Sequence, residues 1–138
     1  MSLKAKGLRL SDDLDREIAR EAAASGRSWS ATTHELLTEA IRMRRAPGVV
    51  FVEGVTGRRA AIAASGLDVW EVVAAWKAVG GGFPALREEL HWLTEPQLRS
   101  ALAYYELYPE EIDARLEREQ EWTPERLRRE LPFAGPTR

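Results

Sequence analysis

The 138-residue sequence contains no cysteine, so it can form neither a disulfide framework nor a thiolate zinc site. Long apolar runs are also missing, because no stretch approaches the roughly eighteen residues that a membrane span requires. The first residues, MSLKAKGLRLSDD, are too polar for a secretory signal. We therefore expect a cytoplasmic protein with no membrane partner.

Residue patterns for catalysis are equally scarce. The two histidines, His34 and His91, lie far apart and have no partners at metal-ligand spacing. The glycine run 80–82 lacks the Lys-Ser/Thr of a phosphate-binding loop and the spacing of a dinucleotide motif. Carboxylates after residue 106 alternate with arginines, as is typical of solvated helix surfaces. We predict no metal, no cofactor and no catalytic residue, and hence a protein that is not an enzyme.

Charge is distributed unevenly along a globular chain that is 44% hydrophobic and 30% charged and has a net charge of −2. Residues 1–46 contain 9 Lys and Arg against 7 Asp and Glu, whereas residues 101–138 contain 6 against 9. This balance argues against a general nucleic-acid coat protein. A dimer would nevertheless double the mild positive charge of the N-terminal region at one surface, which favours contact with phosphates.

The N-terminal region predicts one strand and two helices. Residues 7–10, GLRL, alternate as a half-buried strand does, and Ser11 is a candidate N-cap for a helix that ends at Gly26. Ser28 or Ser30 caps a second helix, one face of which presents Thr33, Leu36, Leu37, Ala40 and Ile41. No second strand follows nearby, and a lone strand leaves its backbone hydrogen bonds unmade. We therefore expect a second copy of the chain to pair with it.

Pro47-Gly48 marks the clearest boundary, and the predicted domains are 1–46, 47–116 and 117–138. Beyond it, β-branched residues around Gly54–Gly57 predict a hairpin. Asp68 starts a helix that the glycine run interrupts, and residues 83–92 form a short one. Thr94 caps a further helix that breaks at Tyr108-Pro109, and a charged helix follows. Thr123 and Pro124 begin a terminal helix.

A strand, a helix, a short Gly-containing turn and a helix within residues 4–45 resemble the ribbon-helix-helix regulators of the Arc and MetJ kind. LRLSDDL is similar to their strand-to-helix junction and GRSWS to their interhelical turn. The resemblance implies a homodimer formed by antiparallel strand pairing and a ribbon that enters the DNA major groove. The residues expected at the dimer interface are Leu8, Leu10, Ile18, Leu37 and Ile41.

The same resemblance assigns DNA-contacting residues. The outward strand positions are Ala5, Gly7 and Arg9, of which only Arg9 can make a bidentate contact with guanine. By strict alternation Lys4 and Lys6 fall on the side of Leu8 and Leu10, and fraying of the strand would bring them to phosphates. The start of the second helix at Ser28 and Trp29 offers its amides to a phosphate. The alternative is a ribbon that dimerises without touching DNA, with Trp29 filling a gap in the core.

Residues 50–115 resemble a second family, a small bacterial domain of unknown function, number four-three-three, found in antitoxins. The resemblance rests on Gly57-Arg58-Arg59, Ile62, Gly66, Val69-Trp70, Leu93-Thr94 and Leu98 through Tyr105. It implies a helix-turn-helix-like three-helix unit in which residues 94–105 form the recognition helix. That helix would offer Gln97 and Arg99 to DNA, whereas the alternative leaves both residues as solvated surface.

The C-terminal tail combines apolar and basic residues on a predicted helix too short to persist alone in water. We expect it to fold on a toxin through Trp122, Leu127, Arg128, Arg129, Leu131 and Phe133. The alternative is that these groups fold back on the middle domain.

Together these patterns predict a mainly α fold with short β elements. It comprises a dimeric ribbon-helix-helix, a β-hairpin with a helix-turn-helix-like unit, and a helical tail. The function implied by the resemblances is that of a VapB-type antitoxin, which neutralises a PIN-like ribonuclease toxin and represses its own operon. The rivals are a stand-alone dimeric transcriptional regulator and a structural dimeric adaptor.

Overall fold

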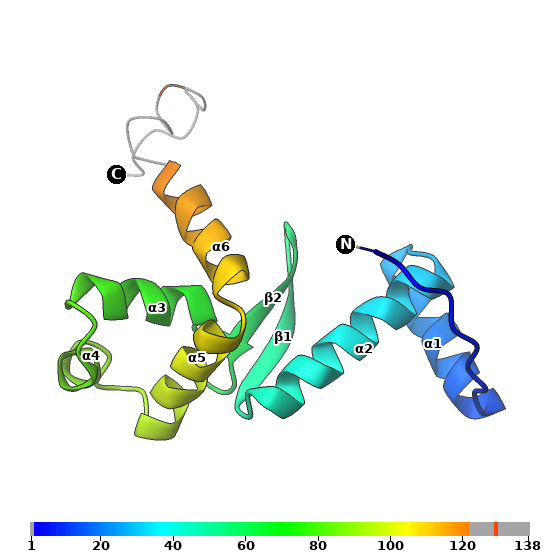
Figure 1. Ribbon diagram of the computed structural model, residues 1–138, viewed down its shortest axis with the longest axis horizontal. Coiled ribbons are helices and arrows are strands. Elements are labelled where there is room, and N and C mark those ends of the chain that lie inside the picture. Colours follow the sequence, from blue (N-terminus) through cyan, green and yellow to red (C-terminus); the bar gives the residue numbers. More distant parts are fainter. Residues whose placement is uncertain (1, 122–128, 130–138) are drawn as a thin grey trace, which may run out of the picture. The chain divides into compact units, whose positions relative to one another are not determined.

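The computed structural model describes residues 2–121 and residue 129. Within these residues the chain is mainly helical with one small antiparallel hairpin, which confirms the predicted fold class at that level (Figure 1). The elements are α1 Asp12–Ser25, α2 Trp29–Arg45, β1 Val49–Gly54, β2 Gly57–Ile62, α3 Val69–Ala78, α4 Phe83–Glu89, α5 Glu95–Leu107 and α6 Pro109–Glu121. Ribbon pairing between two chains and a helix-turn-helix stay predictions.

Local capping signals set the helix ends where the sequence places them. The Ser11 hydroxyl accepts a hydrogen bond from the Leu14 amide at 3.2 Å, and Gly26 ends α1 in the left-handed conformation at φ 67°. Ser28, rather than Ser30, begins α2, because its hydroxyl accepts from the Ala31 amide at 3.1 Å. Each bond satisfies a backbone group that the helix itself leaves unpaired.

The chain divides into an N-terminal unit, Met1–Ile41, and a C-terminal unit, Arg42–Arg138. The division therefore falls inside α2, a few residues before the predicted boundary at Pro47-Gly48. The physical reason is that Ala46 is fully buried in the same hydrophobic cluster as Val49 of β1. The Ala46 amide also closes the last turn of α2 by donating to the Arg42 carbonyl at 2.9 Å.

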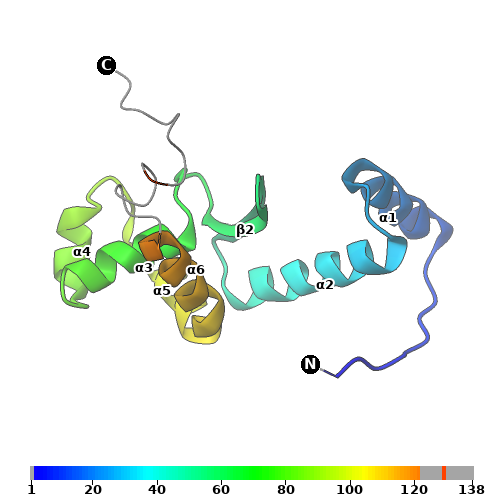
Figure 2. The ribbon, with the colours of Figure 1, turned by 90° about the horizontal axis from the view of Figure 1, so that it is seen from above.

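The core of the C-terminal unit is built around α5. This helix contacts α3, α6 and both strands of the hairpin, and its Leu98, Ala101 and Tyr104 are fully buried. From α3, Val69, Val72 and Val73 complete the same cluster. Figure 2 shows α3, α5 and α6 gathered together. The hairpin pairs Val49 with Ile62 and Gly54 with Gly57, as the turn glycines predict.

The N-terminal unit, in contrast, has a small interior. Its buried apolar side chains among the described residues are Ile18 and Ala22 of α1, joined by the buried Thr32 of α2. Folded units of about 40 residues bury too little surface to be stable without disulfides, metals or oligomerisation. This chain has no cysteine and therefore no disulfide, so we expect the N-terminal unit to be stabilised by packing against another protein surface.

Candidate dimerisation and nucleic-acid interface

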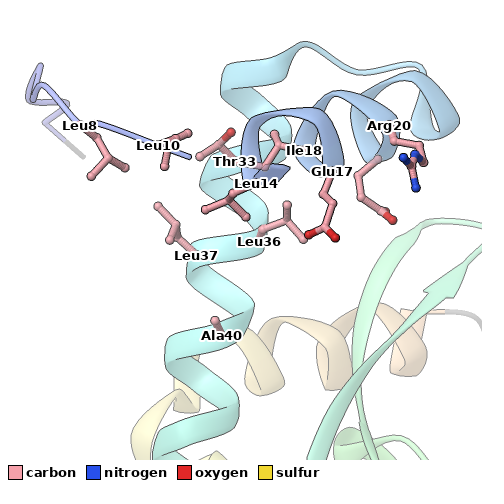
Figure 3. A pocket seen from close by; sticks show the side chains of 11 residues that line it. Leu8, Leu10, Leu14, Glu17, Ile18, Arg20, Thr33, Leu36, Leu37 and Ala40 are labelled. Atoms are coloured by element: carbon pink, nitrogen blue, oxygen red, sulfur yellow. The ribbon is translucent and has the colours of Figure 1, made fainter. Parts of the chain in front are cut away.

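An apolar groove of about 560 Å³ opens on the N-terminal unit (Figure 3). Three segments supply its leucines: the extended residues before α1, α1 itself and α2. In the close view, the side chains of Leu10, Leu14 and Leu37 face the same space. The full lining is Leu8, Leu10, Leu14, Glu17, Ile18, Arg20, Glu21, Thr33, Leu36, Leu37 and Ala40.

Four of the five residues predicted at the dimer interface line this groove: Leu8, Leu10, Ile18 and Leu37. Leu8 is 69% exposed and Leu37 is 53% exposed, whereas Ile18 is buried at the groove floor. The fifth, Ile41, does not line the groove but is 54% exposed on α2. Large apolar side chains gathered in the open in this way mark an interaction surface.

Residues 2–10 are extended and make no backbone hydrogen bond to another described residue. Figure 2 shows this segment as a trace without helix leading into α1. An extended segment with free amide and carbonyl groups is a template for strand pairing with another chain. The segment carries Leu8 and Leu10, which line the groove. A single partner could therefore pair with its backbone and also fill the groove.

Three of the four basic residues predicted to meet DNA lie on this extended segment. Lys4, Lys6 and Arg9 are all exposed, and none makes an ion pair within the described part of the chain. Their charges are therefore available to a phosphate or a base edge. If this segment pairs as a strand, Arg9 would lie on the opposite side from Leu8 and Leu10.

At the start of α2, one of the backbone amides that could bind an anion is already hydrogen-bonded. The Ser28 hydroxyl already accepts the Ala31 amide, so a phosphate there would contact the remaining amides of the first turn. Trp29 is 39% exposed and does not fill a gap in the core. Both residues remain candidates for contact with a phosphate.

Gln97 and Arg99, the candidates on the predicted recognition helix, are engaged within the C-terminal unit. The Gln97 side chain accepts from the Thr94 amide at 2.8 Å and donates to the Ala63 carbonyl at 3.1 Å. Arg99 pairs with Glu95 at 2.8 Å and stacks over the Phe83 ring at 4.2 Å. Gln97 would have to leave these contacts to read a base, whereas the Arg99 side chain is 63% exposed and keeps further donors.

A partly buried polar cluster that sequence reasoning missed joins the end of α2 to α5 and α6. The Tyr104 hydroxyl donates to Glu111 at 2.6 Å and accepts from Arg42 at 2.9 Å, while Arg42 also pairs with Glu111. Burial raises the pKa of the Tyr104 phenol far above its usual range, and the hydrogen bond to Glu111 raises it further. The phenol thus stays a proton donor. Contacts spanning 62 and 69 residues leave no local signal in the sequence.

A second cluster without a sequence signal surrounds a small pocket of the C-terminal unit. Arg58 and Arg59 of β2 and Arg115 and Arg118 of α6 line it together with Trp70 of α3. The pairs Arg58-Arg59 and Arg115-Arg118 lie more than fifty residues apart in the sequence. Only the folded chain brings them together.

The predicted toxin-binding residues lie almost entirely outside the described part of the chain. This holds for Trp122, Leu127, Arg128, Leu131 and Phe133, and Arg129 alone is described, as an exposed helical residue. Elsewhere, no described helix has the length and apolar character needed to cross a bilayer. The described residues also contain no group of three or more His, Asp and Glu side chains placed to hold a metal ion.

The chain matches no family model, no curated protein and no solved structure. The likeness to ribbon-helix-helix regulators and to the antitoxin-associated domain therefore rests on the residues quoted above.

Proposed function

We propose that the chain is a homodimeric DNA-binding regulator that pairs and binds DNA through its N-terminal unit. The observation that carries this proposal is the open apolar groove beside an extended segment with unpaired backbone groups. A second copy of the chain, related by a two-fold axis, satisfies both features at once. Its segment supplies the missing strand and its leucines fill the groove.

DNA is the partner that fits the exposed face of such a ribbon. Pairing of two segments puts Arg9 of each copy on the exposed face of the ribbon, while Leu8 and Leu10 turn toward the helices. Strict alternation puts Lys4 and Lys6 on the leucine side, so they would contact phosphates only from the end of the ribbon. A two-stranded ribbon fits the major groove, where arginine can bind guanine through two hydrogen bonds. The N-terminal unit supports this role better than α5, because the Gln97 side chain already donates to the Ala63 carbonyl within the C-terminal unit.

Within this class we propose the narrower role of an antitoxin that represses its own operon and neutralises a PIN-like ribonuclease. This part rests on the likeness of residues 50–115 to an antitoxin-associated domain. A stand-alone regulator has the same N-terminal unit but lacks a toxin partner. The two roles differ in what the C-terminal tail binds.

Arg9→Ala should weaken binding to the operator by about 1–3 kcal/mol and relax the preference at one base position of each half-site, because a bidentate guanine contact is lost. Fluorescence anisotropy with the native upstream DNA and single-base variants of it would measure both effects. Arg99→Ala serves as the matched control and should leave operator affinity unchanged. If instead Arg99→Ala abolishes binding and Arg9→Ala does not, the C-terminal unit reads the DNA.

Deletion of residues 121–138 should remove toxin binding and leave dimerisation and operator binding intact. The test is co-expression from the native operon with an affinity tag on this chain. The full chain should retain a small ribonuclease through purification, and the truncated chain should lose it. Retention by the truncated chain would place the interface elsewhere, and absence of any partner from the full chain would favour the stand-alone regulator.

A further inference from the structure

The small pocket of the C-terminal unit has the size and lining of an anion site. Its volume is about 90 Å³, which is room for a tetrahedral anion. Four guanidinium groups line it, together with Thr56, Ala60, Trp70, Glu111 and Ile112. Guanidinium groups bind phosphate through planar pairs of hydrogen bonds.

The carboxylates near these arginines leave the pocket itself positive. Glu111 is the single acidic residue of the lining, and its charge is already paired with Arg42. Three further carboxylates pair with lining arginines but do not line the pocket: Glu53 with Arg58 at 2.9 Å, Asp68 with Arg59 at 2.8 Å, and Glu119 with Arg115 at 2.8 Å. Arg58 also donates to the Phe51 carbonyl at 3.1 Å and Arg59 to the Glu53 carbonyl at 3.5 Å. Arg115 has five N–H donors and pairs with one carboxylate, so it keeps donors for an anion.

Two arginines of α6 have more N–H donors than there are hydrogen-bond acceptors around them. Arg118 makes no ion pair with another described residue and is exposed. Arg115 stacks over Trp70 at 5.2 Å, which fixes its guanidinium, and its Nε is buried without a hydrogen-bond acceptor in the described structure. A buried donor without an acceptor destabilises the fold, and an anion in the pocket would supply acceptors.

We propose that this pocket binds an oxyanion of the phosphate class, either free phosphate or a phosphodiester of the nucleic-acid backbone. Arg115 and Trp70 form the fixed wall, Arg118 closes the site from α6, and Arg58 and Arg59 contribute from the hairpin. The site lies wholly in the C-terminal unit. It is thus independent of the dimer groove and of the proposed reading of DNA by Arg9.

In the first test, the full-length protein is titrated with inorganic phosphate at constant ionic strength. The Trp indole and Arg Nε signals are followed by NMR. The Trp70 indole and Arg115 Nε signals should shift and saturate. Arg118→Gln should weaken the Kd roughly tenfold, the effect of losing one charge-assisted hydrogen bond. The matched control is Arg44→Gln, which removes the charge of an exposed residue that does not line the pocket and should leave the Kd unchanged.

A second test separates the two sources of phosphate. If the pocket takes the DNA backbone, Arg118→Gln should weaken binding to all duplexes alike and lower the salt slope by about one, with Arg44→Gln as the comparison. If it takes free phosphate, duplex binding should be unchanged while the phosphate titration responds. The proposal is overturned if phosphate produces no saturable shift and DNA binding is the same in the two variants. Equal weakening by Arg118→Gln and Arg44→Gln in both titrations would overturn it as well.

Discussion

Leu37→Glu should convert the proposed dimer into a monomer. Leu37 is 53% exposed in the single chain, so a charged residue there costs little in the free protomer. In an isologous dimer the substitution acts twice and places two carboxylates in an apolar interface. Leu37 is about half exposed in the free protomer, so its burial contributes about 0.8–1.5 kcal/mol per copy. The desolvation of two carboxylates adds to this loss, so dimerisation should weaken by at least about 3 kcal/mol, or more than roughly a hundredfold in Kd. Sedimentation equilibrium would measure this loss.

His34→Glu is the matched control, because His34 is exposed on the same helix but does not line the groove. It should remain dimeric and bind DNA as the unmodified protein does. Leu37→Glu should also lose operator affinity, since two half-sites require two joined protomers. A dimer of unchanged Kd in the Leu37→Glu variant would show that the groove is not the interface.

Tyr104→Ala should lower the unfolding free energy of the C-terminal unit by about 3–5 kcal/mol, as for other large aromatic residues truncated in a core. The side chain is fully buried, and its ring lies 6.3 Å from that of Phe51 and 4.9 Å from that of Tyr108. Loss of the hydroxyl also removes the bonds to Arg42 and Glu111. Urea unfolding followed on the hairpin amides by NMR would report on this unit alone.

The neighbouring Tyr105 provides an internal comparison. Tyr105 is half-buried, and its hydroxyl donates to Asp113 at 2.6 Å beside Lys77. Tyr105→Ala should therefore destabilise the unit less than Tyr104→Ala does. Equal losses for both variants would contradict the central place given to Tyr104 in the core.

Local features of the fold could be predicted from the sequence because their causes are local. Ser11 and Thr94 cap helices through hydrogen bonds three residues away, and Gly26 adopts the left-handed conformation that ends a helix. The hairpin follows from β-branched residues on either side of turn glycines. Each of these depends on a few adjacent residues, so their patterns survive in the linear chain.

The parts that escaped prediction depend on distant residues. Pro47-Gly48 suggested a boundary, but burial of Ala46 draws the end of α2 into the C-terminal unit. Gln97 donates a hydrogen bond to Ala63, which lies 34 residues away, and no local sequence pattern indicates this contact. The four arginines that line the small pocket come from β2 and α6, and nothing in the sequence indicates that they lie together. The end of α2, the contact of Gln97 and the gathering of the four arginines all depend on packing between residues distant in the sequence.

The central claim is that residues 7–10 pair with the same residues of a second copy. The most direct test is an NMR sample that mixes isotopically labelled and unlabelled protein and is filtered for contacts between protomers. The account predicts cross-peaks between the backbone protons of residues 8–10 of the two copies, together with contacts from Leu8 and Leu10 to Leu37 of the partner. A folded monomer at millimolar concentration, or contacts between protomers that avoid this segment, would contradict it.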